Sequence, residues 1–458
     1  MFAMLMGALV FWVSSASAEE VQAEKYPSLQ AAIDANPGRR IRVPHGKHLF
    51  TRALRITGEG TVLCGEGTLV QQNADGPVLL IEDASDVRIE SLTFTRDREQ
   101  HGTADGVLCR NSSGITLNSV RVLDNRSNAA GIRIEQCENV TVRDSWVINY
   151  KRISIDDRTQ NELLGYAFHC IDGSGIVVNR SRGTSILDCR IIERALIPTP
   201  EMVAKYRLGM LTEGRNPTRL GTLGKRAVDG DRVNNWHQGS AIVVTGPMES
   251  RRTILRGNHI ENAAQAVDLH GDQVICTNNI IHRCLIGLKA THGCRNVILT
   301  GNLIAGVDLW GIVVNPGAAS SKAKAAGDGE PAVGENVDAG LLISNNVISD
   351  FGEGNEYWNW GGRHEDRGSS YAIAFLAAQL ETNPPLRDVL VQGNLVYDSQ
   401  RDAAENARAR PKYRYAVYVE PSQPPAEGLR FVGNLWHPGS SGISNIELHE
   451  VPATGRAE

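Results

Sequence analysis

The sequence predicts an all-β protein whose chain coils into a solenoid, and two recurring features carry this prediction. A short phrase centred on asparagine returns along the chain as LRGNHI, CTNNII, LTGNLI, ISNNVI, VQGNLV and FVGNLW. The first copies stand about 22 residues apart and the later ones about twice as far, which is the interval of a repeat protein with insertions. Short β-branched segments with Gly and Asn turns fill each repeat, and the L-x-x-L-x-L phrase of leucine-rich repeats is absent.

The repeated asparagines have a physical reason to occupy one corner of successive coils. Stacked side-chain amides can hydrogen-bond from coil to coil and can pair turn backbone groups that would otherwise be buried without partners. In earlier repeats the same corner is predicted to hold Leu92, Val120, Ser145 and Cys189. The asparagines are Asn258, Asn279, Asn302, Asn346, Asn394 and Asn434.

The N-terminal segment 1–18, MFAMLMGALVFWVSSASA, is apolar and ends in a small-x-small pattern, which is typical of a secretory signal peptide. We therefore expect a mature domain over 19–458 that is secreted or periplasmic. The run is short for a bilayer span, and no later stretch could span one, so no membrane association of the mature form is expected.

Charge and cysteine content indicate which partners and cross-links to expect. The formal net charge is −5 and the pI is about 6.2, whereas nucleic-acid-binding domains usually carry a basic excess, so no nucleic-acid partner is expected. Eight cysteines are present without a CxxC pair. Cys109, Cys189 and Cys276 fall on inward positions, so we expect mostly reduced, buried thiols.

The stretch YPSLQAAIDANPGRRIRVPHGKHLF resembles the opening helix, turn and first strand of the pectate-lyase-like superfamily. The resemblance covers residues 25–447. It implies a single right-handed parallel β-helix of roughly ten to twelve coils, closed at its N-terminal end by a short helix. Leu29, Ala32 and Ile33 have the i, i+3, i+4 spacing of a helix face that could cover the open end of the core.

Strand alternation places charges on the outside of one strand per coil. In AVDLHG the inward positions are Val267 and Leu269, which leaves Asp268 and His270 outward. Neighbouring coils lie about 4.8 Å apart, so Asp268 is expected to contact Lys289 of the next coil. The same strip is predicted to carry the following outward residues on earlier and later coils: Glu82, Arg110, Arg133, Glu135, Asn179, Arg180, Tyr418 and Glu420. Asn179 and Arg180 on this strip are candidate substrate-binding residues.

Five insertions interrupt the repeat. Those at 196–238, 351–370 and 399–413 leave the third strand of a coil and return before the first, so they should wall one side of the charged strip. Segment 150–175 belongs to the same side, as a degenerate coil or as a loop. The low-complexity segment 318–338 is predicted to be a flap or filler.

Asp268, His270 and Lys289 are the first candidates for chemistry. His or Lys could act as a base on a sugar while the cation neutralises a uronate carboxylate, which β-elimination requires. The alternative is an ordinary ion pair between coils on a solvated strand face.

Asp156 and Asp157, followed by Arg158, are a second candidate group. They could bind Ca²⁺ or supply the paired carboxylates of a glycoside hydrolase, and the alternative is a turn with a capping aspartate. The downstream motifs of polygalacturonase-type hydrolases are poorly matched here. Trp236 with His237, and Trp358 with Trp360, could stack on or bind sugars, and the alternative is packing within the loops.

Three functions follow as hypotheses. The first is an exported enzyme that cleaves an acidic polysaccharide by β-elimination. The second is a glycoside hydrolase that uses two of Asp156, Asp157, Asp172 and Asp268, and the third is a β-helix that binds glycans without catalysis. The polysaccharide substrate comes from the resemblance alone. The spacing of the histidines gives no reason to expect a zinc or copper site. Ca²⁺ is the one cofactor that the sequence allows as a candidate. The sequence does not predict the oligomeric state.

Overall fold

The structure is a computed structural model. It describes residues 20–97, 100, 102–153, 159–161, 165–167, 171–194, 239–307, 309–317, 319–327, 331–350, 370–376, 382–399, 413–421, 426–448 and 450–451.

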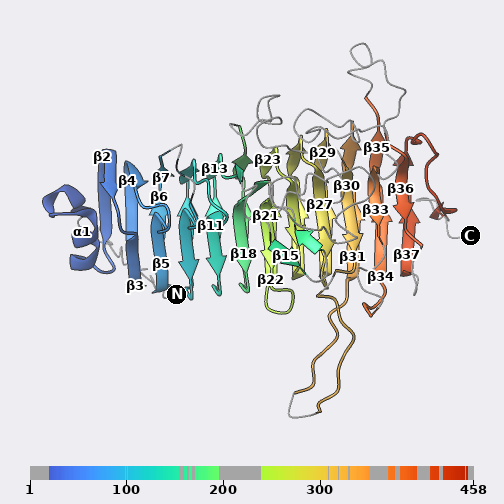
Figure 1. The fold of residues 1–458 in the computed structure, drawn as a ribbon, viewed down its shortest axis with the longest axis horizontal. Coiled ribbons are helices and arrows are strands. Elements are labelled where there is room, and N and C mark those ends of the chain that lie inside the picture. The colour runs from blue at the N-terminus through green and yellow to red at the C-terminus, as the bar shows by residue number, and fades with distance from the viewer. Residues whose placement is uncertain are drawn as a thin grey trace, which may run out of the picture.

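The described chain is a parallel β-helix whose strands stack in three parallel ladders, and from β5 to β38 each coil contributes one strand to each ladder (Figure 1). The first ladder is an eleven-stranded sheet, which agrees with the predicted number of coils. Its strands are β3 (Leu54–Glu59), β5 (Leu79–Ser85), β8 (Val107–Arg110), β11 (Ala130–Glu135), β18 (Ser174–Asn179), β21 (Ser240–Thr245), β24 (Gln265–Leu269), β27 (Ile286–Thr291), β30 (Trp310–Asn315), β33 (Tyr371–Phe375) and β36 (Tyr415–Val419).

The other two ladders meet at β4, which pairs with both β6 and β7. The second ladder comprises β1 (Val21–Gln22), β2 (Arg40–Phe50), β4 (Val62–Gln71), β6 (Arg88–Glu90), β9 (Thr116–Asn118), β12 (Thr141–Arg143), β19 (Ser185–Leu187), β22 (Arg251–Arg256), β25 (Asp272–Thr277), β28 (Arg295–Thr300), β31 (Ala339–Ser344), β34 (Arg387–Gln392), β37 (Glu427–Val432) and β39 (Glu450–Val451). The third comprises β7 (Thr93–Arg96), β10 (Arg121–Leu123), β13 (Trp146–Ile148), β20 (Arg190–Ile192), β23 (His259–Glu261), β26 (Ile280–His282), β29 (Leu303–Ala305), β32 (Val347–Ser349), β35 (Leu395–Tyr397) and β38 (Leu435–Trp436).

Aliphatic side chains from all three ladders fill the interior, because alternate residues of each strand point inward. Val267 and Leu269 are fully buried, as the alternation predicts. At the N-terminal end, a short 3-10 helix η1 (Ala23–Lys25) precedes helix α1 (Leu29–Ala35), which lies at the end of the stack (Figure 1). The Ser28 side chain caps α1 by accepting a hydrogen bond from Ala31 N, and the helix buries Ala32 and Ile33 against the core.

The repeated G-N and N-N pairs form one corner of each coil. The first residue of each pair adopts the left-handed conformation, for example Asn278 with φ of 54° and Gly301 with φ of 65°, which Gly and Asn adopt at the least cost. The second residue belongs to a buried ladder of amides that runs from Asn258 to Asn434. In each step, as from Asn279 to Asn302, one Oδ1 accepts from both the backbone N and the Nδ2 of the preceding asparagine, at 3.1 and 2.9 Å. The predicted asparagine ladder is confirmed.

The thiols agree with the sequence prediction over the described residues. All seven described cysteines are free and buried. Burial raises the pKa of Cys189, Cys276 and Cys284 to about 12, so these thiols stay protonated at neutral pH. Among the described helices, none is long and apolar enough to cross a bilayer.

Segment 150–175 is a loop and not a coil, because β11 pairs directly with β18 across it. Its own strands pair antiparallel, β14 (Arg152–Ile153) with β17 (Ile171–Asp172) and β15 (Thr159–Asn161) with β16 (Gly165–Ala167). Between β30 and β31 the chain reaches away from the sheets as a long hairpin (Figure 1), with antiparallel bridges from Ser321 to Asn336 and from Lys324 to Val333.

Candidate functional site

The outer face of the first ladder brings together Asp268, His270 and Lys289, which we call the Asp268 cluster. Asp268 on β24 is the register partner of Lys289 on β27. Asp268 Oδ1 lies 3.6 Å from Lys289 Nζ and 3.0 Å from His270 Nε2. The contact that the repeat predicted between Asp268 and Lys289 is therefore present in the structure.

The Asp268 carboxylate is enclosed although its strand position is outward. Its side chain is 11% exposed, beside 15% for His270 and 18% for Lys289. Burial by itself would raise the pKa of Asp268, but the Lys289 ammonium and His270 outweigh burial and hold that pKa well below its usual range. Asp268 is therefore ionised at neutral pH, and the Lys289 ammonium lies beside it.

The contacts of His270 define its tautomer. An ionised carboxylate only accepts hydrogen bonds, so the contact with Asp268 Oδ1 places a proton on Nε2 of His270. In the neutral ring the lone pair is then on Nδ1, which lies 3.3 Å from the Thr245 hydroxyl of β21. Asp268 thus orients the imidazole and leaves Nδ1 as the basic atom.

His292 completes this group, and the sequence analysis did not single it out for chemistry. It follows β27 directly, and its ring meets that of His270 edge to face with centroids 4.5 Å apart. Burial, followed by the neighbouring His270 and Lys289, lowers the pKa of His292 to about 4. A signal was present in the sequence, because the His-Gly pairs of LHGD and THGC lie one repeat apart.

The base of the 318–338 hairpin is fastened to the turn that carries His292. The fully buried carboxylate of Asp338 accepts hydrogen bonds from the backbone N of Gly293 and Cys294, each at 3.0 Å, and from Ser320 Oγ at 2.8 Å. Asn336 Nδ2 donates to His292 O at 2.9 Å. The prediction that segment 318–338 is a flap or filler is therefore wrong for its base. There Asp338 and Asn336 form hydrogen bonds with the backbone of the turn that carries His292.

Replacing Asp338 by alanine is expected to lower the free energy of unfolding by about 2–3 kcal/mol, because three buried donors lose their acceptor. Ser320→Ala removes one of the three bonds and should cost about 1 kcal/mol. Urea unfolding of both variants measures the difference. Equal, negligible losses would show that the hairpin base does not stabilise the turn.

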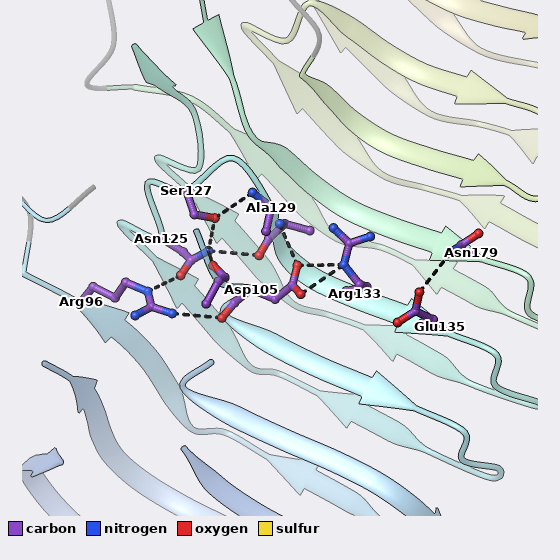
Figure 2. Close-up of polar contacts among 10 residues, drawn as sticks. Arg96, Asp105, Asn125, Ser127, Ala129, Arg133, Glu135 and Asn179 are labelled. Atoms are coloured by element: carbon purple, nitrogen blue, oxygen red, sulfur yellow. Dashed lines mark hydrogen bonds and ion pairs between the residues drawn. The ribbon is translucent and has the colours of Figure 1, made fainter. Parts of the chain in front are cut away.

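Polar residues on the N-terminal coils satisfy one another (Figure 2). Arg96 Nε donates to Asn125 Oδ1 at 2.6 Å, and the Asp105 carboxylate accepts from Arg133 Nε at 3.0 Å and from Ala130 N at 2.8 Å. Burial raises the pKa of Asp105, and Arg133 opposes that shift. These groups are held by their own neighbours, so this network stabilises the coils.

The predicted binding residues Asn179 and Arg180 lie at the end of β18. Asn179 Nδ2 donates to Glu135 Oε1 at 3.2 Å (Figure 2). Arg180 is not on the strand face. It occupies the following turn with φ of 49°, because the strand ends at Asn179 and alternation ends with it. Within the part of the chain that the structure describes, no hydrogen bond or ion pair links either residue to the Asp268 cluster.

Several other predicted site residues lie outside the described residues: Asp156, Asp157, Arg158, Trp236, His237, Trp358 and Trp360. Among the described residues, no group of three or more His, Cys, Asp or Glu side chains is arranged to hold a metal ion. Whether Asp156 and Asp157 bind Ca²⁺ stays a prediction.

Residues 58–196 match the family model described as the right-handed β-helix region. No curated protein sequence matches the chain. Among solved structures, the Dettilon tailspike protein (gp208) is 12% identical with a TM-score of 0.52, over 91% of this chain and 64% of the tailspike, so the chain spans less than two thirds of that protein.

Two further solved structures share the architecture. The hyperthermoactive exopolygalacturonase from Thermotoga maritima is 13% identical with a TM-score of 0.50, over 82% of this chain and 87% of the enzyme. The DFA-IIIase from Arthrobacter chlorophenolicus A6, without its lid and in complex with GF2, is 11% identical with a TM-score of 0.50, over 94% and 98% of the two chains. Likeness at such low identity concerns the fold. With its three parallel ladders, this chain is a right-handed parallel β-helix protein.

Proposed function

We propose that this protein is a carbohydrate-active enzyme that cleaves an acidic polysaccharide by β-elimination at the Asp268 cluster. The observation that carries the proposal is the Asp268 carboxylate, which holds both the Lys289 ammonium and the His270 imidazole on the outer face of the first ladder. One protein of the same fold is named exopolygalacturonase, which makes a uronate polymer a candidate substrate for this chain. Segment 1–18 supports a secreted or periplasmic site of action.

Each residue has a distinct task in the proposed reaction. Lys289 binds the uronate carboxylate and neutralises it, which makes the C5 proton acidic enough to remove. His270 Nδ1 accepts that proton after the substrate has displaced the Thr245 hydroxyl. The C4–O bond breaks as the C4–C5 double bond forms. The leaving oxygen takes up a proton from water, and His270 returns the abstracted proton to solvent. Asp268 pairs with the Lys289 ammonium and holds the proton of His270 on Nε2.

The state of Asp268 favours elimination over hydrolysis at this cluster. An inverting or retaining glycosidase needs a carboxylic acid that holds its proton near neutral pH. Asp268 is ionised well below that range, and it is the one carboxylate of the Asp268 cluster. A hydrolase would therefore have to draw its acid from elsewhere, such as Asp156, Asp157 or Asp172.

The test is incubation of the full chain with polygalacturonate, alginate and hyaluronan, monitored by the ultraviolet absorbance of the unsaturated uronate product. We expect absorbance to rise with one of these polymers and to be abolished in His270→Ala. New reducing ends without the absorbance would replace this proposal with the hydrolase. Binding without either product would replace it with the glycan-binding protein.

A further inference from the structure

The base of the 318–338 hairpin fixes the tautomer of the His292 imidazole, which lies in the turn after β27. Ala319 N donates a hydrogen bond to His292 Nδ1 at 3.2 Å. A backbone N–H can only donate, so Nδ1 must present its lone pair and the ring proton must lie on Nε2. The contact exists only with the neutral ring, since an imidazolium carries a proton on both nitrogens.

The surroundings of His292 oppose its protonation on balance. Lys289 on β27 and His270 after β24 disfavour a second positive charge, and burial acts in the same direction. Asp268 acts in the opposite sense and is already engaged by Lys289 and His270. On the hairpin side, the Asp338 carboxylate accepts from Gly293, Cys294 and Ser320 instead of from the ring.

The ring is also fixed in position by the backbone of the hairpin. A Cβ built on Gly317 would collide with His292 Nδ1 and would lie 2.6 Å from Thr291 Oγ1. The φ of Gly317 lies outside the left-handed region, so space and not backbone strain requires glycine there. The ring also meets the His270 ring edge to face, at 83°. His292 thus contacts both Gly317 and the Asp268 cluster.

We propose that His292 is a substrate-binding residue that works as a fixed hydrogen-bond donor through Nε2–H, and that Gly317 and Ala319 are positioning residues that impose this form. This inference rests on the proposed function, and it adds the directional contact that the uronate carboxylate needs. Lys289 attracts the anion as a point charge without a preferred direction, whereas a ring N–H donates along one line. A donor that is neutral at neutral pH also leaves proton transfer to His270.

The first experiment reads the ring directly and needs no substrate. Nitrogen-15 NMR of histidine-labelled protein should show His292 as the Nε2–H form, unprotonated from pH 8 down to pH 5, because its pKa of about 4 lies below this range. Gly317→Ala should move the pKa toward the ordinary value near 6.5. The matched control is Gly334→Ala in the same hairpin, where a Cβ meets nothing within 4 Å. A His292 pKa near 6.5 in the wild type would overturn the inference.

The second experiment tests the role of the donor with polygalacturonate, alginate and hyaluronan. On the polymer that the wild type cleaves, His292→Leu should raise KM about tenfold or more, while His292→Gln, which keeps an amide donor, should recover most of the loss. Full activity of His292→Leu would refute the donor role and leave the proposed function standing. A wild type that cleaves none of the three polymers would refute the proposed function and the substrate role of His292, whereas the NMR result would still decide the tautomer.

Discussion

Lys289→Met should lower kcat/KM on the cleaved uronate polymer by about 10²–10³-fold, the range found when one preorganised electrostatic group is removed from an active site. The ammonium lies 3.6 Å from Asp268 Oδ1 and the Lys289 side chain is 18% exposed, so it belongs to the cluster and keeps some access to solvent. Methionine keeps most of the length and volume of the side chain. The loss should therefore report the missing charge, and steady-state kinetics measure it.

The stability of the same variant needs its own control, because methionine leaves Asp268 with one cationic partner fewer. A loss of about 1–3 kcal/mol in the free energy of unfolding is expected from the enclosed, poorly paired carboxylate. Lys289→Met combined with Asp268→Asn removes both charges and should regain most of this stability while activity stays low. Recovered activity in the double variant would mean that Lys289 serves only to pair Asp268. Lys322→Met on the exposed hairpin is the matched control.

Asn302→Ala should destabilise the fold by about 3 kcal/mol, because Asn302 is an interior member of the ladder. The Asn302 side chain is buried, donates to Cys276 O at 3.1 Å and to Asn346 Oδ1 at 2.9 Å, and accepts twice from Asn279. Alanine leaves buried donors of Asn279 unpaired and opens a cavity at the corner. Urea or thermal unfolding measures the loss.

The ladder supplies its own matched control. Asn434 is its last member, is half-buried, and receives the bonds of Asn394 on one side only. Asn434→Ala should cost about 1 kcal/mol, since water can replace the lost contacts. Equal losses for the two variants would contradict the view that burial of the amide chain is what makes the ladder stabilising.

The sequence predicted the features that depend on period. The interval between asparagines predicted the ladder, and alternation within one strand predicted that Asp268 faces outward beside Lys289. Both follow from local geometry that repeats in every coil, so one correct alignment places many residues at once. The burial of Ala32 and Ile33 by the N-terminal helix followed from the i, i+3, i+4 spacing.

The sequence did not predict the features that depend on turns and insertions. Arg180 follows the end of its strand, where alternation no longer applies. Asp338 reads as one more polar residue in a low-complexity segment, and its role appears only when the hairpin base meets the turn at Gly293 and Cys294. His292 was missed for the same reason, because its partners come from the far end of an insertion. Such contacts are set by how loops return to the scaffold and leave no periodic signal.

The distribution of the Asp268 cluster over coils has a consequence for how such a protein can change over time. Asp268 and His270 come from one coil, Lys289 from the next, and Thr245 from the one before. Each coil of a solenoid contacts its immediate neighbours. Whole coils can therefore be duplicated or deleted elsewhere in the stack with little effect on the three coils that carry the Asp268 cluster and Thr245. Descendants of this chain could therefore lengthen or shorten the stack, coil by coil, while inheriting the Asp268 cluster unchanged.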